Sequence, residues 1–335
     1  MVSFTVFKGS KNGTIIQSKT TREVGPDEVL VKITHSGLCG TDIHFQNTDM
    51  ALGHEGAGIV EQVGKDVKTL TINDRVGWGW VHSTCGNCNQ CLSGLENLCP
   101  HSKAYGNANL DQGSFATHGV WKPEFLFKIP ASMELQHAAP LMCGGATVFH
   151  AMRDVKSTDR VGVIGVGGLG HLAVQFASKM GCDVVVFSST EDKREEARGL
   201  GASQFVATRG KDELDIGPPL DHLFVTTSKP PNWNVYLPLI APRGAIYPLS
   251  IDKGDLVLPY QTMINLEMRV QGSVVSPVVT HRKMLEFASR HGVKPIIEEF
   301  VMTVGGIEKA MGRLKEGKMR YRGVLVVTQG AGHVC

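Results

Sequence analysis

Four of the eight cysteines lie close together in the sequence, at positions 85, 88, 91 and 99. Gaps of two residues let successive thiolates converge on one metal ion, and four thiolates complete the tetrahedral shell of zinc with no open position for a substrate. We therefore interpret Cys85, Cys88, Cys91 and Cys99 as the ligands of a structural zinc ion. An iron–sulfur cluster or a redox disulfide is the alternative, but the three-residue gap that usually precedes the fourth cysteine of a ferredoxin motif is absent.

A second set of metal-binding residue types is spread along the chain. Cys39 begins the run Cys-Gly-Thr-Asp-Ile-His, His54 and Glu55 follow Gly53, and Cys143 precedes two glycines. A cysteine, a histidine and a second cysteine or a glutamate hold zinc and leave one position for a substrate oxygen, where the metal polarises a carbonyl or acidifies an alcohol. Asp42 is suited to accept a hydrogen bond from the second nitrogen of a ligating imidazole. Taken singly, His54 or Cys143 would more often be an ordinary buried core residue than a metal ligand.

A glycine-rich turn follows an apolar run at 161–164 and precedes a helical pattern at 171–180. This context is the one in which the spacing Gly-x-Gly-x-x-Gly indicates a dinucleotide-binding site. The first glycine permits the tight turn, the second lets a pyrophosphate approach the backbone, and the third lets the helix pack on the strand. The pyrophosphate would then lie at the helix N-terminus. The motif reads Gly165-Val166-Gly167-Gly168-Leu169-Gly170.

The end of the next predicted strand indicates which dinucleotide is preferred. An NAD site usually places an acidic residue there to bind the ribose 2′-hydroxyl, whereas this chain has Ser188, Ser189 and Thr190 followed by Lys193 and Arg194. Three hydroxyls and two cations suit a 2′-phosphate, so the sequence favours NADP(H). The alternative is that Lys193 and Arg194 form only the solvated first turn of a helix.

These motifs need two kinds of scaffold to position them. Between residues 28 and 129 short strand patterns predict a compact β-rich unit, at 28–33, 58–63, 74–76 and 125–129. Between 160 and 275 strands alternate with helices, which predicts a parallel sheet covered on both faces. The strands are expected at 161–164, 183–187, 204–206, 220–225, 245–247 and 269–272, and the helices at 171–180 and 191–200. A helix at 282–291 and a strand at 323–327 are expected to return to the first unit.

Composition excludes several classes of protein. The 335 residues predict about two domains, and 42% hydrophobic with 20% charged residues is typical of a folded globular chain. The net charge is 34 − 32 = +2, which argues against nucleic acid or an anionic membrane as the main partner. No apolar run reaches the ~20 residues of a membrane span, and residues 1–7 lack the basic flank of a secretory signal. We therefore expect a cytoplasmic protein with metal-bound rather than disulfide-bonded cysteines.

The four-cysteine lobe, the dispersed cysteine, histidine and glutamate set and the glycine motif, taken together, resemble the zinc-dependent medium-chain alcohol dehydrogenases. The resemblance extends from about Gly25 to Val327. The run 188–190 with Lys193, and the run 320–322, are most similar to the NADPH-dependent cinnamyl-alcohol-dehydrogenase and aldehyde reductase branch. The resemblance implies a GroES-like β-rich catalytic domain plus a Rossmann domain with a doubly wound parallel sheet, usually in a homodimer. We predict a catalytic domain at 1–148 with a zinc lobe at 84–100, an NADP-binding domain at 149–283, and a return to the catalytic domain at 284–335.

The resemblance also implies roles for individual residues. It implies a catalytic zinc ion, the second in the chain, held by Cys39, His54 and Cys143, with Glu55 as a neighbour or an exchangeable ligand. Thr41 matches the hydroxyl that touches the substrate oxygen, and His44 matches the residue that passes the proton to solvent. Thr147 matches a residue that packs beside the nicotinamide. No role is assigned to Cys182 or Cys335.

One departure from the family leaves the substrate open. Only nine residues separate His44 from His54, and Leu52 stands where proline is usual, whereas related enzymes carry a longer loop that helps to wall the substrate pocket. Candidates for that role are Trp78, Trp80, Tyr105, Val274 and Val275. The expected reaction is reversible hydride transfer between NADP(H) and a small alcohol, aldehyde or ketone. A reductase of an iminium or activated alkene, and a non-catalytic NADPH-binding protein stabilised by zinc, are the alternatives.

Overall fold

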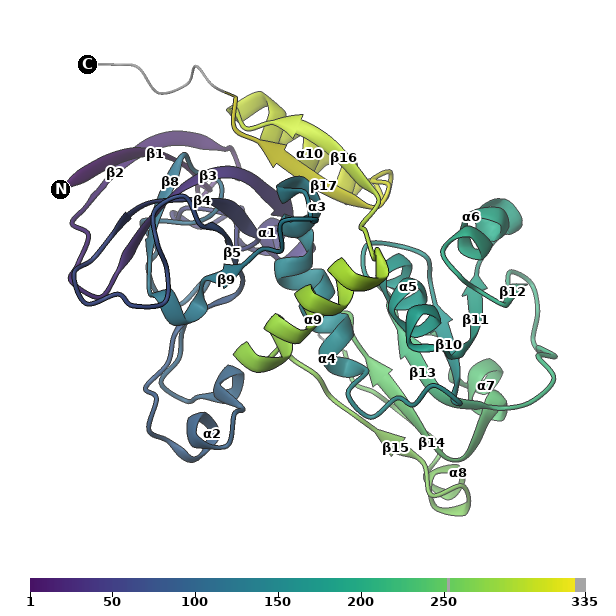
Figure 1. The fold of residues 1–335 in the computed structure, drawn as a ribbon. Coiled ribbons are helices and arrows are strands. Elements are labelled where there is room, and N and C mark those ends of the chain that lie inside the picture. The colour runs from purple at the N-terminus through teal and green to yellow at the C-terminus, as the bar shows by residue number, and fades with distance from the viewer. Residues whose placement is uncertain (252–253, 329–335) are drawn as a thin grey trace. The chain divides into compact units, whose positions relative to one another are not determined.

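The chain folds into two compact units, which the computed structural model describes over residues 1–251 and 254–328 (Figure 1). Unit 1 comprises Met1–Ala146, Val275–Arg290 and the chain from Lys294 onward, and unit 2 comprises Thr147–Val274 with His291–Val293. The domain bounds given above stay a prediction. Residues 329–335, which include Cys335, belong to the segment 284–335 and lie outside the described residues. Within the described ranges no helix is both long and apolar enough to cross a membrane.

Unit 1 is built on a seven-stranded sheet in the order β16-β17-β3-β4-β5-β9, with β8 also paired to β3. These strands are β3 (Val29–Leu38), β4 (Gly56–Val63), β5 (Arg75–Trp78), β8 (His118–Trp121), β9 (Phe127–Lys128), β16 (Ile297–Val301) and β17 (Arg322–Val326). The last strand, β17, pairs antiparallel with β3 and parallel with β16. Two small antiparallel pairs complete the unit, β1 (Val2–Lys8) with β2 (Ile16–Arg22) and β6 (Val81–Ser83) with β7 (Lys103–Ala104).

Glycine at two strand positions lets an aromatic core form under this sheet. A Cβ on Gly56 would lie 2.2 Å from the Trp78 ring, and a Cβ on Gly58 would lie 2.2 Å from the Lys32 carbonyl oxygen of the neighbouring strand. Trp78 is consequently buried, with 1% of its surface exposed, and its ring centroid lies 5.4 Å from that of Trp121. The core around these rings includes Val31 of β3, Val60 of β4 and Val76 of β5.

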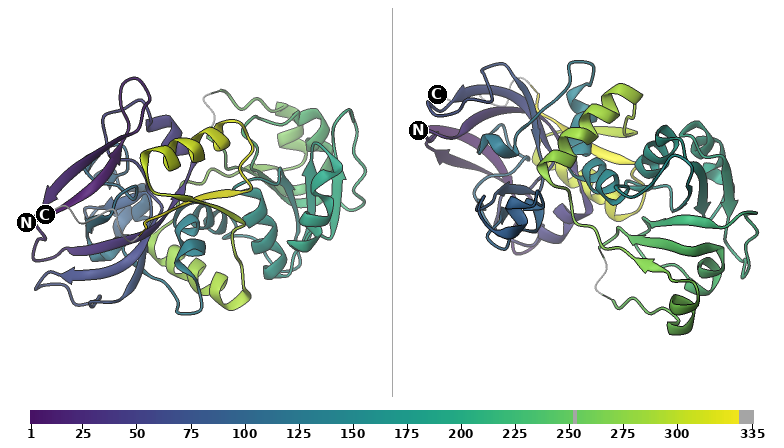
Figure 2. Two further views of the ribbon diagram at one scale, coloured as in Figure 1. Left: turned by 90° about the horizontal axis from the view of Figure 1, so that it is seen from above. Right: turned by 60° about the horizontal axis from the view of Figure 1, so that its bottom comes forward.

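The helices of unit 1 are short, apart from two near its C-terminal end. The early ones are α1 (Gly40–Phe45), α2 (Asn89–Leu92), α3 (Leu135–Pro140), the π-helix η3 (Leu141–Gly145) and α4 (Ala146–Ala151), which crosses into unit 2, with 3₁₀ turns η1 (Glu96–Leu98) and η2 (Pro123–Phe125). The longer two are α9 (Val278–His291) and α10 (Val304–Lys315). The Thr303 hydroxyl accepts a hydrogen bond from the backbone N–H of Gly306 and caps α10, which lies along β16 and β17 (Figure 2).

Unit 2 is a six-stranded parallel sheet in the order β12-β11-β10-β13-β14-β15. The strands are β10 (Arg160–Ile164), β11 (Asp183–Ser188), β12 (Gln204–Ala207), β13 (Leu220–Val225), β14 (Ile240–Pro248) and β15 (Arg269–Val270), and the helices are α5 (Gly170–Met180), α6 (Arg194–Gly199), α7 (Trp233–Tyr236) and α8 (Tyr260–Asn265), with 3₁₀ turns η4 (Glu191–Lys193) and η5 (Leu237–Leu239). This strand order is that of a doubly wound dinucleotide-binding fold, which places ligands where the order reverses, between β10 and β13. The predicted fold class is confirmed.

Where the structure differs from the predicted elements, local chemistry explains the difference. The predicted helix at 191–200 is split, because η4 precedes α6 and Lys193 adopts a non-helical backbone between them. Among the elements that were not predicted are the strands β1, β2 and β16 and the helix α10. Of these, α10 carries three glycines, a composition that lowers helix propensity, and its stability comes from an apolar face that buries Ile307, Ala310 and Met311.

Candidate functional site

The four cysteines of the lobe 84–100 converge on one point. The Sγ atoms of Cys85 and Cys99 lie 3.6 Å apart, those of Cys88 and Cys91 3.5 Å apart, and those of Cys85 and Cys91 4.0 Å apart. Four sulfurs about 2.3 Å from a central zinc ion would be separated by about 3.8 Å along each edge of the tetrahedron. The observed separations therefore fit a closed zinc site.

Local turns of the lobe bring these sulfurs together. Gly86, with φ of +72°, turns the chain after Cys85, and Cys88 immediately precedes α2, which carries Cys91. Cys99 follows η1, where its backbone N–H donates to the Glu96 carbonyl at 3.0 Å. The backbone N–H groups that face Cys85, that of Asn87 above all, lower the pKa of its thiol to about 6, which favours the thiolate that binds metal.

A second group of four ligand-type residues is assembled inside unit 1. The ligand atoms of Cys39, His54, Glu55 and Cys143 all lie within 4.8 Å of one another. Cys39 is the N-cap of α1, His54 and Glu55 immediately precede β4, and Cys143 lies in the π-helix η3. His54 and Glu55 are fully buried, while the two cysteines are partly exposed, so the group is closed on one side and open on the other.

Two orphaned polar atoms show that this group fits a metal ion. Nε2 of His54 and Oε2 of Glu55 are buried, and neither has a hydrogen-bond partner, an arrangement that costs free energy unless a ligand completes it. The second ring nitrogen of His54, Nδ1, lies 3.0 Å from Oδ1 of Asp42. This hydrogen bond fixes the tautomer in which the lone pair of Nε2 points at the group. The other Asp42 oxygen accepts the backbone N–H of Cys39 at 2.8 Å, and so aligns two of the ligands at once.

Arg322 is a functional residue to which the sequence assigned no role. Its buried guanidinium forms an ion pair with Oε1 of Glu55. Burial raises the pKa of Glu55 to about 7, and the attraction of Arg322 opposes that shift. A hydrogen bond from Cys143 holds the pKa of the Cys39 thiol well below its usual value, and His54 and Arg322 act in the same direction. The sequence signals for Arg322 are its place in the run 320–322 and its charge at the start of an otherwise apolar strand.

Thr41 and His44 lie on α1 three residues apart, a spacing that places them on neighbouring positions of one helix face. The hydroxyl of Thr41 is 3.6 Å from the sulfur of Cys39, and Thr41 is 8% exposed. His44 is exposed to solvent. The structure therefore places Thr41 beside the group of metal-ligand residues and His44 at the surface. A path that carries a proton from this group to solvent would need both positions.

Aromatic side chains surround the ligand His54. The ring of Tyr105 is stacked on it with centroids 4.8 Å apart, and Trp80 meets it edge-on at 5.5 Å. Tyr105 is buried and its hydroxyl accepts the backbone N–H of Gly53 at 3.1 Å, so it supports the ligand loop. Trp80 is partly exposed. Of the remaining pocket candidates, Trp78 belongs to the core of unit 1, Val275 is half-buried, and Val274 is 48% exposed in unit 2.

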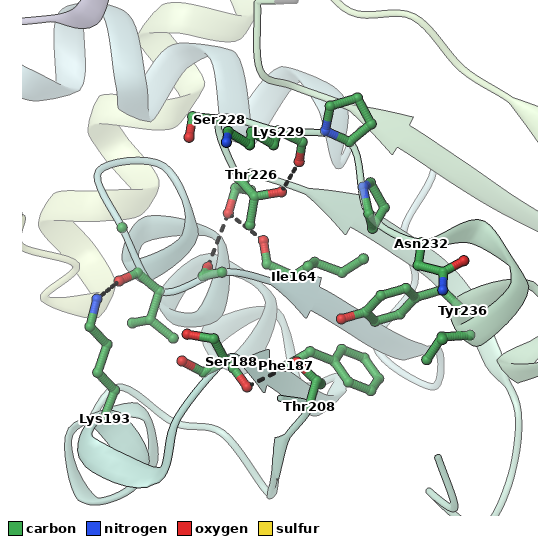
Figure 3. A pocket seen from close by; sticks show the side chains of 18 of the residues that line it. Ile164, Phe187, Ser188, Lys193, Thr208, Thr226, Ser228, Lys229, Asn232 and Tyr236 are labelled. Carbon is green, nitrogen blue, oxygen red and sulfur yellow. Dashed lines mark hydrogen bonds between the residues drawn. The ribbon is translucent and has the colours of Figure 1, made fainter. Parts of the chain in front are cut away.

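The glycine turn of unit 2 borders a cavity of about 580 Å³ at the ends of β10 and β13 (Figure 3). Gly165 has φ of +93°, which L side chains rarely adopt, and a Cβ on Gly170 would lie 1.8 Å from the Gly165 carbonyl oxygen. Nothing lies within 4 Å of a Cβ built on Gly167, which lines the cavity. These are the turn, the tight helix packing and the open backbone that a bound pyrophosphate requires, so the residues fit a dinucleotide.

The predicted phosphate-binding residues divide into two groups. Ser188, Ser189 and Lys193 line the cavity, and Nζ of Lys193 donates to the Val166 carbonyl at 2.6 Å. Thr190 instead donates its hydroxyl to Asp192, and Arg194 is paired with Glu191. Gly168, Leu169 and Thr147 are not among the residues that line this cavity.

Further residues that line the cavity follow the strands β12 and β13, and the sequence analysis did not predict them. Thr208 and Lys211 follow β12, and Thr226, Thr227 and Lys229 follow β13. The signal that would have found them is topological, because ligands of a doubly wound sheet lie beyond the carboxyl ends of its strands. The lining contains three lysines and no acidic residue among the positions that the structure describes.

Known proteins match this chain over most of its length. Residues 25–131 match the alcohol dehydrogenase GroES-like domain, and residues 168–290 match the zinc-binding dehydrogenase family. An aldehyde reductase from Synechocystis is 33% identical over 90% of this chain and 92% of its own length. Cinnamyl alcohol dehydrogenase 8 of Arabidopsis thaliana is 33% identical over 92% of this chain and 90% of its own length.

Two solved structures extend this agreement to the fold. A cinnamyl alcohol dehydrogenase from Sorghum bicolor superposes with a TM-score of 0.90 at 30% identity, covering 100% of both chains. The Helicobacter pylori enzyme, complexed with NADP(H), has a TM-score of 0.88 at 28% identity and covers 97% of this chain and 98% of its own. The chain carries both family domains in the expected order and shares their architecture throughout, and it therefore belongs to the zinc-binding alcohol dehydrogenases, a family of oxidoreductases.

Proposed function

We propose that this protein is a zinc-dependent alcohol dehydrogenase or aldehyde reductase that transfers hydride reversibly between NADP(H) and a small alcohol, aldehyde or ketone. The observation that carries the proposal is the buried, unpartnered Nε2 of His54 within a group of four ligand atoms. When bound there, zinc supplies Lewis acidity toward a carbonyl or alcohol oxygen, and NADPH bound to unit 2 supplies the hydride.

The side chains of unit 1 hold the metal and conduct the proton. Cys39, His54 and Cys143 are the proposed ligands, and Glu55, tied to Arg322, is the neighbour or exchangeable ligand. The Thr41 hydroxyl, beside Cys39, donates the proton that a reduced carbonyl oxygen takes up. The exposed His44 replaces that proton from solvent, because an imidazole titrates near neutral pH.

The side chains of unit 2 bind and select the cofactor. The backbone at Gly165, Gly167 and Gly170 receives the pyrophosphate, with Gly168 and Leu169 continuing the turn into α5. Ser188, Ser189 and Lys193 favour a 2′-phosphate because none of them repels it and Lys193 is already held beside the turn by Val166. We propose that Thr147 packs beside the nicotinamide, as its place in the family implies.

An apolar surface on unit 2 supports assembly as a homodimer. Strand β15 is at the edge of the parallel sheet, and a contiguous stretch of sequence around it exposes large hydrophobic side chains, namely Ile251 68%, Val257 75%, Tyr260 81%, Ile264 59% and Val270 38%. An unpaired edge strand with exposed apolar side chains is a template for association. The seven described cysteines are all reduced thiols, and zinc sites that need reduced thiols favour a cytoplasmic location.

The direct test combines metal analysis with a substrate screen. The enzyme purified without chelator is expected to contain two zinc ions per chain, one resistant to a mild chelator and one removed together with activity. NADPH oxidation is expected with members of a panel of aldehydes and ketones, and a parallel panel of imines tests the alternative substrate class. One zinc ion per chain, iron with visible absorbance, or no carbonyl reduction would contradict the proposal.

A further inference from the structure

The 2′-phosphate end of the cavity carries a basic residue that the sequence motif does not contain. Ser188 and Ser189 end β11, and the next chain segment to reach them is the turn at 208–211, which follows the neighbouring strand β12. The backbone N–H of Thr208 donates to the Ser188 carbonyl at 2.8 Å, and its hydroxyl donates to the same oxygen at 3.2 Å (Figure 3). The N–H of Arg209 donates to the Ser189 carbonyl at 3.2 Å. The turn is therefore fixed to the two serines by three hydrogen bonds.

The shape of this turn brings Lys211 back to the cavity. The backbone N–H of Lys211 donates to the Thr208 carbonyl at 3.1 Å, and Gly210 between them has φ of +74°. This is the combination of a one-to-four hydrogen bond and a glycine at the third position that defines a type II turn. Thr208 and Lys211 both line the cavity, whereas Arg209 does not.

The two basic side chains of the sequence motif, Lys193 and Arg194, already have partners within the protein. Arg194 is held by Glu191 at 2.6 Å, and Lys193 donates to the Val166 carbonyl at 2.6 Å. Lys211 is exposed, and within the described residues no hydrogen bond or ion pair holds its ammonium group. Arg194 is the main cause of the lowered pKa of Glu191, and the positive charge of Lys211 contributes in the same direction.

We propose that Lys211 is a second determinant of 2′-phosphate recognition, which together with Lys193 places a positive charge on each side of the Ser188–Ser189 strand end. The inference rests on the proposed use of NADP(H). A phosphate dianion bound between two ammonium groups and two serine hydroxyls has a donor for each oxygen, as charge-assisted phosphate sites do. A nucleotide without the 2′-phosphate offers neither ammonium group an anionic partner and gains nothing from them.

The test measures binding of cofactor fragments, so that neither zinc nor turnover enters the result. Adenosine 2′,5′-bisphosphate and AMP differ by the 2′-phosphate alone, and their dissociation constants are obtained by calorimetry with the zinc-loaded full chain. Lys211→Gln is expected to weaken adenosine 2′,5′-bisphosphate about tenfold, as for a charged hydrogen bond at a partly exposed site, and AMP less than about twofold. Lys211→Arg is expected to restore the wild-type preference.

Arg209→Gln is the matched control, because it removes the same charge from the same turn at a position outside the cavity lining. Equal losses for Lys211→Gln and Arg209→Gln would mean that general electrostatic attraction, and not a contact, is responsible, and would overturn the inference. So would an unchanged affinity of Lys211→Gln for the bisphosphate. If the wild-type protein binds AMP as tightly as the bisphosphate, the proposed use of NADP(H) itself is wrong.

Discussion

At the scale of single residues, the proposed metal centre depends on which buried polar atoms have a hydrogen-bond partner and which do not. Asp42 uses one oxygen for His54 and the other for the backbone of Cys39. Arg322 satisfies one oxygen of Glu55 and leaves the second unpartnered. His54 and Glu55 are thus each fixed by a partner at one polar atom, and each has a second polar atom without a partner in the ligand group. This is how a binding site is preorganised, because the ligands do not need to reorient when the ion enters.

Replacing His54 by Ala is expected to remove the ligand with the fully buried nitrogen and to abolish carbonyl reduction with loss of one zinc ion. NADPH binding should persist, because the glycine turn lies in unit 2. The measurements are zinc per chain, turnover and NADPH affinity. His44→Gln is the comparison. It should keep both zinc ions and lose turnover by up to about 10²–10⁴-fold, the range of general acid–base catalysis. An active His54→Ala enzyme with two zinc ions would exclude this site assignment.

Replacing Trp80 by Ala is expected to change the size of substrate that the enzyme accepts. Trp80 contacts the ring of His54 edge-on and is the partly exposed member of the aromatic cluster, so its removal opens space beside the metal without removing a ligand. The ratio of kcat/KM for a bulky aldehyde to that for a short aldehyde should rise at least about tenfold, as when pocket volume decides selectivity. Trp78→Phe, a change in the core, should leave this ratio unchanged, and a ratio that does not respond to Trp80→Ala would remove Trp80 from the pocket wall.

At the scale of elements, short irregular segments do the positioning and the regular strands provide the frame. Cys39 caps α1, Cys143 lies in a π-helix, and the lobe of four cysteines has only α2 and η1 as regular structure. Such segments are stabilised by what they bind and by tertiary contacts. The longer helix α9 is also anchored by a tertiary contact, because its His281 ring stacks on Phe127 with centroids 3.9 Å apart.

The α9 contact predicts an acid sensitivity. Burial lowers the pKa of His281 to about 3, against an ordinary value of 6.5. Below pH 6.5 the unfolded chain therefore takes up a proton that the folded chain does not, so this residue lowers the free energy of unfolding as the pH falls. In His281→Phe the ring stack on Phe127 should be retained, and the pH dependence that His281 adds to the free energy of unfolding should be lost.

Denaturant unfolding at neutral pH and near pH 5.5 is the measurement. Between these two conditions the wild-type protein should lose about 1.4 kcal/mol more than His281→Phe. Equal losses for the two proteins would show that the imidazole is protonated in the folded state. His101→Phe, a change at an exposed histidine, should keep the wild-type loss.

At the scale of the whole molecule, the sequence predicted the fold and the main motifs of each site. It did not predict the residues that other strands add to those sites. The four-cysteine spacing and the glycine motif are local patterns, so their geometry follows from the chain nearby. Arg322 and Lys211 could not be assigned in this way, because each reaches its site through the pairing of separate strands, β17 with the distant β3 and β12 with β11. A local sequence pattern does not show which strands pair or which residues then lie opposite one another.

The exposed surface around β15 predicts the oligomeric state. Tyr260→Asp together with Ile264→Asp places two charges in the apolar stretch of unit 2 and is expected to convert a dimer to a monomer in analytical ultracentrifugation. A desolvated, unpaired charge is costly enough to dissociate a standard interface. The same double change at Leu92 and Leu95 of the zinc lobe, which are also exposed, should leave the dimer intact. A wild-type monomer, or a dimer that tolerates the first pair, would disprove this assignment.

The pairing of β17 with β3 has a consequence for synthesis of the protein on the ribosome. Unit 2 is nearly continuous in sequence and can fold as soon as β15 has emerged, whereas the sheet of unit 1 lacks an internal strand until residues 322–326 are made. Until then Glu55 has no Arg322 beside it, and a buried carboxylate without its counter-ion is costly. Nascent chains stalled after Val274 should therefore show a protease-resistant unit 2 and a cleavable unit 1, and the proposed catalytic metal should be acquired only once residues 322–326 have emerged.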